Sequence, residues 1–283
     1  MSKRVRSKRP AAEVAEAGCS SLLSVAKRPA CGPAPDRLAE GTSAHLPPAV
    51  VINLARRADR WEEVKERLGR LSHALDVERL QAVDGAVQKI GIAEVARSWN
   101  TARNWRYVTK VFEGGEQCGY TAKSLDMTPG ERGCAASHIL AWRQCSAGSG
   151  ALMVLEDDAL PQPRFGAIVL QALADLRDQR PDILYLGYTQ AAPWRRKVSK
   201  AVREAEYLWT TVGYILWPSG ARKLLDALPV DQPVDNFMAT LMASQTLRGF
   251  AVVPEVVKQA KPWNVDNDVA HSDDVAWIQN CPS

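Results

Sequence analysis

Apolar runs of strand length alternate with amphipathic helical segments from residue 49 onward, and this alternation constrains the fold more than any other feature of the sequence. The run Ala49-Val50-Val51-Ile52 ends at Asn53-Leu54 and predicts a buried strand. Residues 77–83 predict a second strand. The helix predicted between them has one apolar stripe, formed by Trp61, Val64, Leu68 and Leu71. The repeated strand-helix order predicts the α/β class, with a mostly parallel sheet flanked by helices.

Later segments continue the pattern. Thr128-Pro129-Gly130-Glu131 combines an N-cap hydroxyl, a proline at the first helical position and a glutamate three residues after the cap, which predicts a helix to about Cys145. Residues 86–125 have no clear hydrophobic period and are expected to form a long irregular connection. We therefore predict one folded domain over residues 49–283. Its further strands are predicted at 151–155, 183–186, 210–217 and 250–253, and its further helices at 165–176 and 218–228.

Residues 1–48 have a different composition. They hold six of the 17 prolines and no Phe, Trp or Tyr, which predicts a disordered basic tail. Its basic clusters, ending at Arg9 and at Lys27-Arg28, fit a nuclear address, a phosphate-contacting arm or a plain solvated tail. Neither an apolar signal-peptide core nor a run long enough to span a bilayer is found in the sequence. A cytoplasmic location is expected, and the tail leaves a nuclear one open.

The net positive charge of the chain comes entirely from this tail. Residues 49–283 carry 28 basic and 28 acidic side chains, so the folded part is formally neutral. A nucleic-acid-binding domain shows a basic excess, and no nucleic-acid partner is therefore expected. The six cysteines contain no C-x-x-C pair and are predicted to be mostly reduced thiols.

The acidic triplet Glu156-Asp157-Asp158 follows directly after a predicted buried strand. Open α/β sheets bind ligands at the carboxyl ends of their strands, and three adjacent carboxylates repel one another there. Because strand side chains alternate, Glu156 and Asp158 can face the same side and share a hard divalent cation, which in turn would bridge a diphosphate. The alternative is a purely structural acidic turn, the commoner origin of such a short pattern.

Other candidate residues also have two interpretations. Asn53, Arg56, Arg57, Asp59 and Arg60 lie where side chains reach a nucleotide, although Asp59 and Arg60 equally suit capping and pairing within the helix. His138 is either a core histidine or a phosphate donor. Asp235, at the start of a short apolar helix, is either its N-cap or a proton acceptor. The cluster His271-Ser272-Asp273-Asp274 is either a solvated loop or a set of metal ligands that the C-terminal segment brings to the site when it folds over the ligand.

Placed in order, these segments resemble glycosyltransferase family 25, which includes lipopolysaccharide-core glycosyltransferases and procollagen hydroxylysine galactosyltransferases. The similar segments span residues 50–274 and are 51–61, 82–85, 130–142, 155–158, 213–214, 220–225, 233–237 and 272–273.

The resemblance implies a GT-A-type Rossmann-like fold, a UDP-hexose donor carrying galactose or glucose, a divalent cation (Mn²⁺, or Mg²⁺) and inversion at the anomeric carbon. It also implies a hydroxyl acceptor on a glycan, lipopolysaccharide or protein. By this resemblance, Glu156 and Asp158 would bind the cation, His271 or Asp273 would complete the set of cation ligands, and Asp157 would support these ligands or contact the sugar. Asn53, Arg56, Arg57 and Asp84 would contact the nucleotide, and His138 would lie near the donor. Asp235 would be the general base.

Two other functions are considered. A catalytically inactive family member would use the same pocket, or its surface, as a binding module. A metal-dependent nucleotide hydrolase would share the acidic triplet but would leave the other segments unexplained. Acceptor choice is expected to depend on the loops outside the shared segments, at residues 99–112 and 194–197.

Overall fold

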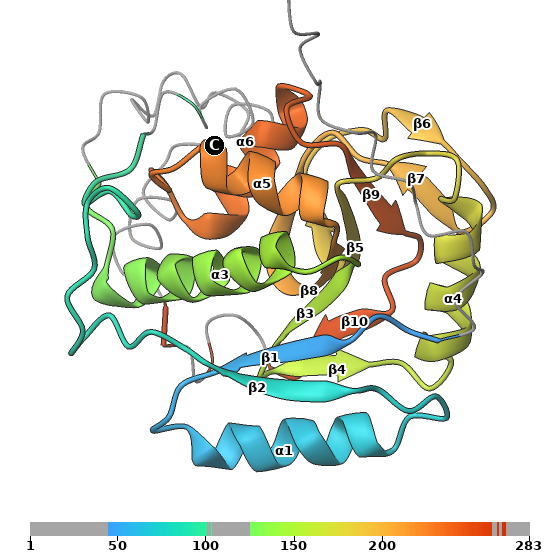
Figure 1. Cartoon of the computed structure of the whole chain (residues 1–283), viewed down its shortest axis with the longest axis horizontal. Helices are drawn as coiled ribbons and strands as arrows, with labels where there is room; N and C mark the ends of the chain where they lie inside the picture. The colour runs from blue at the N-terminus through green and yellow to red at the C-terminus, as the bar shows by residue number, and fades with distance from the viewer. Residues whose placement is uncertain (1–44, 101–102, 104–124, 262–264, 266–267, 270–283) are drawn as a thin grey trace, which may run out of the picture. The chain divides into compact units, whose positions relative to one another are not determined.

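The structure is a computed structural model that describes residues 45–100, 103, 125–261, 265 and 268–269. Within these residues, an eight-stranded sheet of order β2-β1-β3-β8-β5-β9-β7-β6 is covered by helices, and β10 and β4 form a separate two-stranded sheet (Figure 1). The strands are β1 (Ala49–Asn53), β2 (Val77–Gln81), β3 (Leu152–Glu156), β4 (Ala159–Pro161), β5 (Ile183–Gln190), β6 (Arg196–Lys197), β7 (Val202–Glu204), β8 (Leu208–Leu216), β9 (Gly249–Val252) and β10 (Val257–Gln259). The helices are α1 (Ala58–Gly69), α3 (Pro129–Ala147), α4 (Phe165–Asp175), α5 (Pro218–Asp226) and α6 (Val234–Ala243).

The predicted α/β class, with a central sheet flanked by helices, is confirmed. Strand β1 pairs in parallel with β2 and β3, and β5 pairs in parallel with β9. Strand β8 is antiparallel to both of its neighbours, β3 and β5, so the sheet as a whole is mixed. The reason lies between β5 and β8, where the β6-β7 hairpin replaces the crossover helix that parallel neighbours need.

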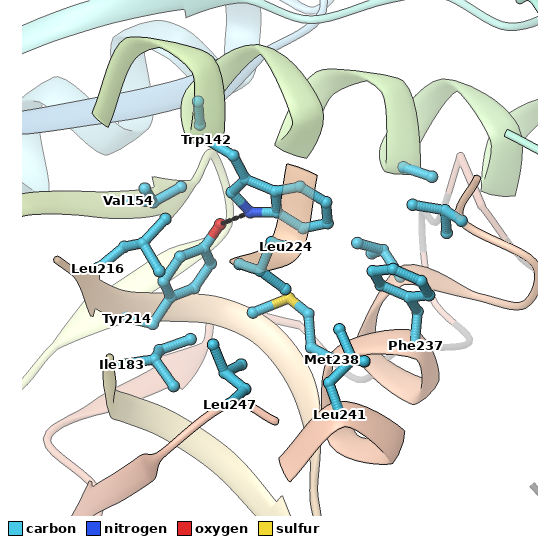
Figure 2. Close-up of a cluster of buried hydrophobic side chains, with 14 of the residues drawn as sticks. Trp142, Val154, Ile183, Tyr214, Leu216, Leu224, Phe237, Met238, Leu241 and Leu247 are labelled. Carbon is cyan, nitrogen blue, oxygen red and sulfur yellow. Dashed lines mark hydrogen bonds between the residues drawn. The ribbon is translucent and has the colours of Figure 1, made fainter. Parts of the chain in front are cut away.

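Both faces of the sheet are buried. On β1, Val50 and Ile52 pack into a core shared with α3, α5 and α6, whereas Ala49 and Val51 pack into a second core shared with α1 and α4. Figure 2 shows the first core, in which Trp142 of α3 donates a hydrogen bond from Nε1 to Oη of the buried Tyr214 on β8 at 3.1 Å. The predicted buried strand is thus covered on both sides.

Helix α3 begins at the predicted capping box. Thr128 Oγ1 accepts a hydrogen bond from the Glu131 backbone N–H at 3.1 Å, and the Glu131 carboxylate accepts one from the Thr128 N–H at 2.7 Å. The first turn lies against the loop after β2, where a Cβ on Gly85 would stand 1.8 Å from the Pro129 carbonyl oxygen. Only glycine allows this close approach, which brings the buried side of α3 to the carboxyl end of the sheet.

Several elements differ from the sequence prediction. The short strands β4, β6, β7 and β10 were not predicted, because two or three residues are too few to show a period. Helix α6 begins at Val234 with Pro233 at its N-cap, so Asp235 does not cap it. The predicted tail falls almost wholly outside the described residues and stays a prediction. Across the described part of the chain, no helix has the length and apolar character needed to cross a membrane.

Candidate functional site

A cavity of about 190 Å³ lies at the carboxyl ends of β1, β2 and β3, where the sequence predicts a ligand site. Helices α1 and α3 and residues 259–261, 265 and 268–269 complete its walls. Asn53, Arg57 and Asp235 lie outside the lining, and His271 and Asp273 lie outside the described residues. The predicted site residues that line the cavity are Arg56, Asp84, His138, Glu156, Asp157 and Asp158.

The middle residue of the acidic triplet joins β3 to β1 and α1. Asp157 accepts a hydrogen bond from Asn53 Nδ2 at 2.7 Å and forms an ion pair with Arg60 Nη1 at 3.1 Å. Burial raises the pKa of Asp157 despite these two donors. Asn53 is itself buried, and its Oδ1 accepts a hydrogen bond from Arg79 at 2.5 Å. The hydrogen bond between Asn53 and Asp157 therefore joins the end of β1 to the residue after β3, and Arg60 joins α1 to the same carboxylate.

The outer two carboxylates have different surroundings. Glu156 accepts a hydrogen bond from Thr211 Oγ1 at 2.5 Å and lies 3.4 Å from His138 Nε2. Asp158 Oδ2 accepts a hydrogen bond from Gln259 Nε2 at 3.2 Å. The other oxygen, Asp158 Oδ1, is buried without a hydrogen-bond partner among the described residues. A buried carboxylate oxygen of this kind is a candidate cation ligand.

The charges of this cluster are unbalanced. Burial, together with the neighbouring carboxylates of Glu156 and Asp157, raises the pKa of Asp158 to about 7. Burial also opposes ionisation of Glu156, but hydrogen bonds with His138 and Thr211 outweigh burial and lower its pKa. A cation held between Glu156 and Asp158 would remove the conflict, so the residues present fit the divalent cation that the family resemblance implies.

Asp158 should reduce the stability of the cation-free fold above neutral pH. Its pKa is about 7 in the folded protein and 3.8 in an ordinary aspartate, so folding takes up a proton between these pH values. Stability therefore falls as pH rises through this window. After discounting for partial exposure, we expect Asp158→Asn to stabilise the protein by about 2 kcal/mol at pH 8. Urea titrations at pH 8 and pH 4.5 measure the effect, which should fall to about a quarter at the lower pH. An equal effect at both pH values would contradict the assignment.

Arg56 lines the cavity, and its neighbour Arg57 shares a carboxylate partner with it. Arg56 pairs with Asp84 at 2.8 Å and with Asp268 at 2.8 Å, and Arg57 pairs with the other oxygen of Asp268 at 3.0 Å. Hydrogen bonding from Arg56 lowers the pKa of Asp84. The two arginines that are predicted to contact the nucleotide thus bind the Asp268 carboxylate. Sequence reasoning missed Asp268, which stands in a loop without periodicity or motif.

Asp235 does not line the cavity and contacts β8. Its Oδ2 accepts a hydrogen bond from the Thr210 backbone N–H at 3.2 Å, and its Oδ1 accepts one from the Asn236 N–H at 2.7 Å. Burial raises the pKa of Asp235 against these two donors. Thr210 has a φ of 72°, and the pairing of β8 with β5 is irregular there. This irregularity turns the Thr210 N–H toward Asp235 while the next residue, Thr211, reaches Glu156.

His138 is a core histidine with one ring nitrogen at the cavity, and its role as a phosphate donor stays a prediction. Its side chain is fully buried, and Nδ1 lies 2.9 Å from Tyr214 Oη in the core. Its other nitrogen, Nε2, faces Glu156 at the cavity. Cys134, one turn earlier on α3, also lines the cavity and was missed, because a lone cysteine in a helix gives no signal of a site.

The fold and the cavity together define an α/β protein with carboxylates and arginines at the ligand-binding edge of its sheet, as in many nucleotide-dependent enzymes. Comparison of sequences gives the family: the profile described as "Glycosyltransferase family 25 (LPS biosynthesis protein)" matches residues 46–208, more than half of the chain. The chain belongs to glycosyltransferase family 25.

Curated relatives agree with this assignment. A "Glycosyltransferase 25 family member" of Drosophila pseudoobscura pseudoobscura is 30% identical over 216 residues, covering 71% of this chain and 31% of the relative. "Procollagen galactosyltransferase 1" of Danio rerio is 28% identical over 200 residues, 68% of this chain and 30% of the relative. "Inactive glycosyltransferase 25 family member 3" of Homo sapiens is 29% identical over 202 residues, 66% of this chain and 30% of the relative. The chain thus matches about a third of the length of these relatives.

Proposed function

We propose that this protein is a metal-dependent, inverting GT-A-type glycosyltransferase that moves galactose or glucose from a UDP-sugar to a hydroxyl group of a glycan, lipopolysaccharide or protein. The observation that carries the proposal is the convergence of Glu156 and Asp158 on one cavity, with a buried Asp158 oxygen that lacks a hydrogen-bond partner among the described residues. Family membership and the presence of a procollagen galactosyltransferase among the relatives support the choice of reaction.

The donor would lie between the arginines and the carboxylates. Glu156 and Asp158 would hold the divalent cation, which when bound neutralises diphosphate charge and stabilises the UDP leaving group. Arg56 and Arg57 each bind one oxygen of an anion, the Asp268 carboxylate. Two oxygens of a phosphate group can accept the same pair of hydrogen bonds. Donor binding would therefore replace Asp268 on the two arginines.

Asp235 is the proposed general base. Direct displacement with inversion needs a group on the acceptor side of the sugar to take the proton from the attacking hydroxyl. The raised pKa of Asp235 makes its carboxylate a stronger proton acceptor than an ordinary aspartate. Two backbone N–H donors, from Thr210 and Asn236, orient both of its oxygens.

The alternative is a member of the family that binds its ligand without transfer. Several of the relatives are named as inactive family members, which keeps this alternative relevant. The presence of Glu156, Asp158 and Asp235 together in this chain favours an active enzyme.

Release of UDP from UDP-galactose and UDP-glucose, with and without Mn²⁺, tests the proposal without knowledge of the acceptor. We expect slow Mn²⁺-dependent hydrolysis of one donor and no cleavage of free UDP. Cleavage of UDP itself would indicate a nucleotide hydrolase. Donor binding without hydrolysis, measured by calorimetry, would indicate an inactive binding module, and absence of both would overturn the proposed donor site.

A further inference from the structure

A second set of metal-ligating side chains lies beside the acidic triplet and shares one residue with it. Cys134 and His138 are four residues apart on α3, so they face the same side of the helix. Glu156 approaches them from the end of β3. One ligand atom from each residue lies within 4.8 Å of the others. These three side chains, Cys134, His138 and Glu156, are called the thiol cluster below.

The imidazole of the thiol cluster is held in the orientation that a metal ligand needs. Trp142 donates to Tyr214 Oη, which fixes the phenol in the core (Figure 2). His138 Nδ1 lies 2.9 Å from that same oxygen, and the two rings stack with centroids 5.8 Å apart. Nε2 consequently points toward Glu156. Metal-bound histidines characteristically use their second nitrogen in this way, because the partner on that nitrogen fixes the ring.

The distances and the electrostatics both suit a cation. Metal–ligand bonds of about 2.0–2.3 Å place the ligand atoms of a tetrahedral site roughly 3.3–3.8 Å apart, so small side-chain rotations would close the thiol cluster around an ion. Burial is the main cause of the raised pKa of the Cys134 thiol, and the negative charges of the Glu156, Asp235, Glu131 and Asp158 carboxylates raise it further. A positive ion at this position would offset that charge.

The donor set selects the kind of ion. Thiolate and imidazole are ligands for Zn²⁺, whereas Mn²⁺ and Mg²⁺ prefer oxygen. We propose that the thiol cluster binds Zn²⁺ through Cys134 Sγ, His138 Nε2 and a Glu156 oxygen, with the fourth position open to the cavity. Binding replaces the Cys134 S–H bond by a Zn–S bond and releases the proton to solvent. With zinc on Nε2, the imidazole proton would lie on Nδ1, which faces Tyr214 Oη at 2.9 Å.

The thiol cluster and the proposed catalytic cation compete for Glu156. A zinc ion held by Cys134 and His138 would take this carboxylate from the Glu156–Asp158 pair and occupy one wall of the donor cavity. Zinc should therefore displace Mn²⁺ and inhibit donor binding. This consequence for activity rests on the proposed function, whereas zinc binding itself does not.

Titration of the full-length protein with Co²⁺ tests the site, because a cobalt–thiolate bond gives charge-transfer absorption in the near ultraviolet. We expect this band in the parent and its loss in Cys134→Ser, with zinc affinity, measured by displacement of Co²⁺, weakened at least about 100-fold. Cys145→Ser is the matched control, since Cys145 is buried on the same helix with its Sγ 3.2 Å from the Leu216 carbonyl oxygen. It should leave the band and the affinity unchanged.

A charge-transfer band of parental intensity in Cys134→Ser would overturn the proposal, as would a parent protein without the band. Should serine at this position unfold the chain, as judged by circular dichroism, Cys134→Ala and Glu156→Gln make the same test. Free Mn²⁺, followed by electron paramagnetic resonance, should rise as zinc is added to the Mn²⁺-loaded parent. A cobalt–thiolate band together with failure to hydrolyse any UDP-sugar would keep the zinc site and reject the proposed function.

Discussion

Asp158→Asn should abolish Mn²⁺-dependent binding of the UDP-sugar and reduce transfer at least about 100-fold. The substitution removes the buried carboxylate oxygen that has no hydrogen-bond partner among the described residues, and with it the charge that a hard cation requires. An asparagine oxygen can still accept the hydrogen bond from Gln259, so the surrounding structure should be retained. Calorimetric titration with Mn²⁺ and UDP measures the loss.

The matched control is Asp178→Asn, an equal change of charge at an exposed position. It should bind Mn²⁺ and UDP as the parent does. The combination expected for Asp158→Asn is distinctive, because the variant should be more stable than the cation-free parent at pH 8 and yet unable to bind donor. Parental binding of Mn²⁺ and UDP by Asp158→Asn would remove this residue from the cation site.

Asp235→Asn should leave donor binding intact and reduce transfer by about 100- to 10,000-fold, the range that general-base catalysis contributes. Asparagine is similar in shape and can accept the hydrogen bond from the Thr210 N–H, but it cannot take a proton from the acceptor hydroxyl. UDP affinity by calorimetry and transfer to an added acceptor separate the two effects.

Combining Asp235→Asn with Asn236→Asp moves the carboxylate to the neighbouring position of α6. This double variant should not regain transfer, because the side-chain oxygen of residue 236 accepts a hydrogen bond from Trp209 Nε1 at 3.0 Å. Unchanged turnover by Asp235→Asn alone would reject the general-base assignment, and loss of UDP affinity in that variant would show that Asp235 supports the donor site instead.

Much of the fold could be predicted because its signals are local. The apolar run of β1, the stripe of α1 and the capping box of Thr128 each specify an element within a few residues. The antiparallel direction of β8 was harder to predict, because strand direction depends on the segment that connects two strands. Here that segment is the β6-β7 hairpin, whose strands are too short to show a period.

The site could be predicted only in part, for the same reason. The acidic triplet is found from three consecutive residues, and the structure brings it into one cavity with Arg56, Asp84 and His138. The partners that set its charges come from distant segments. Thr211 reaches Glu156 through an irregular stretch of β8, and Gln259 reaches Asp158 because β10 pairs with β4. Such contacts depend on tertiary geometry, which no single-sequence pattern encodes.

The contact between Asn53 and Asp157 joins residues 104 positions apart, and the contact between Arg56 and Asp268 joins residues 212 positions apart. Closing loops of this length has an entropic cost that must be met before such contacts form, and chains rich in long-range contacts fold slowly. The cavity should therefore be among the last parts of the molecule to assemble during folding. In a chain emerging from the ribosome, the acidic triplet would stay exposed and separated from its distant partners until β3 had entered the sheet. Ligand binding would therefore report on completed folding rather than guide its early steps.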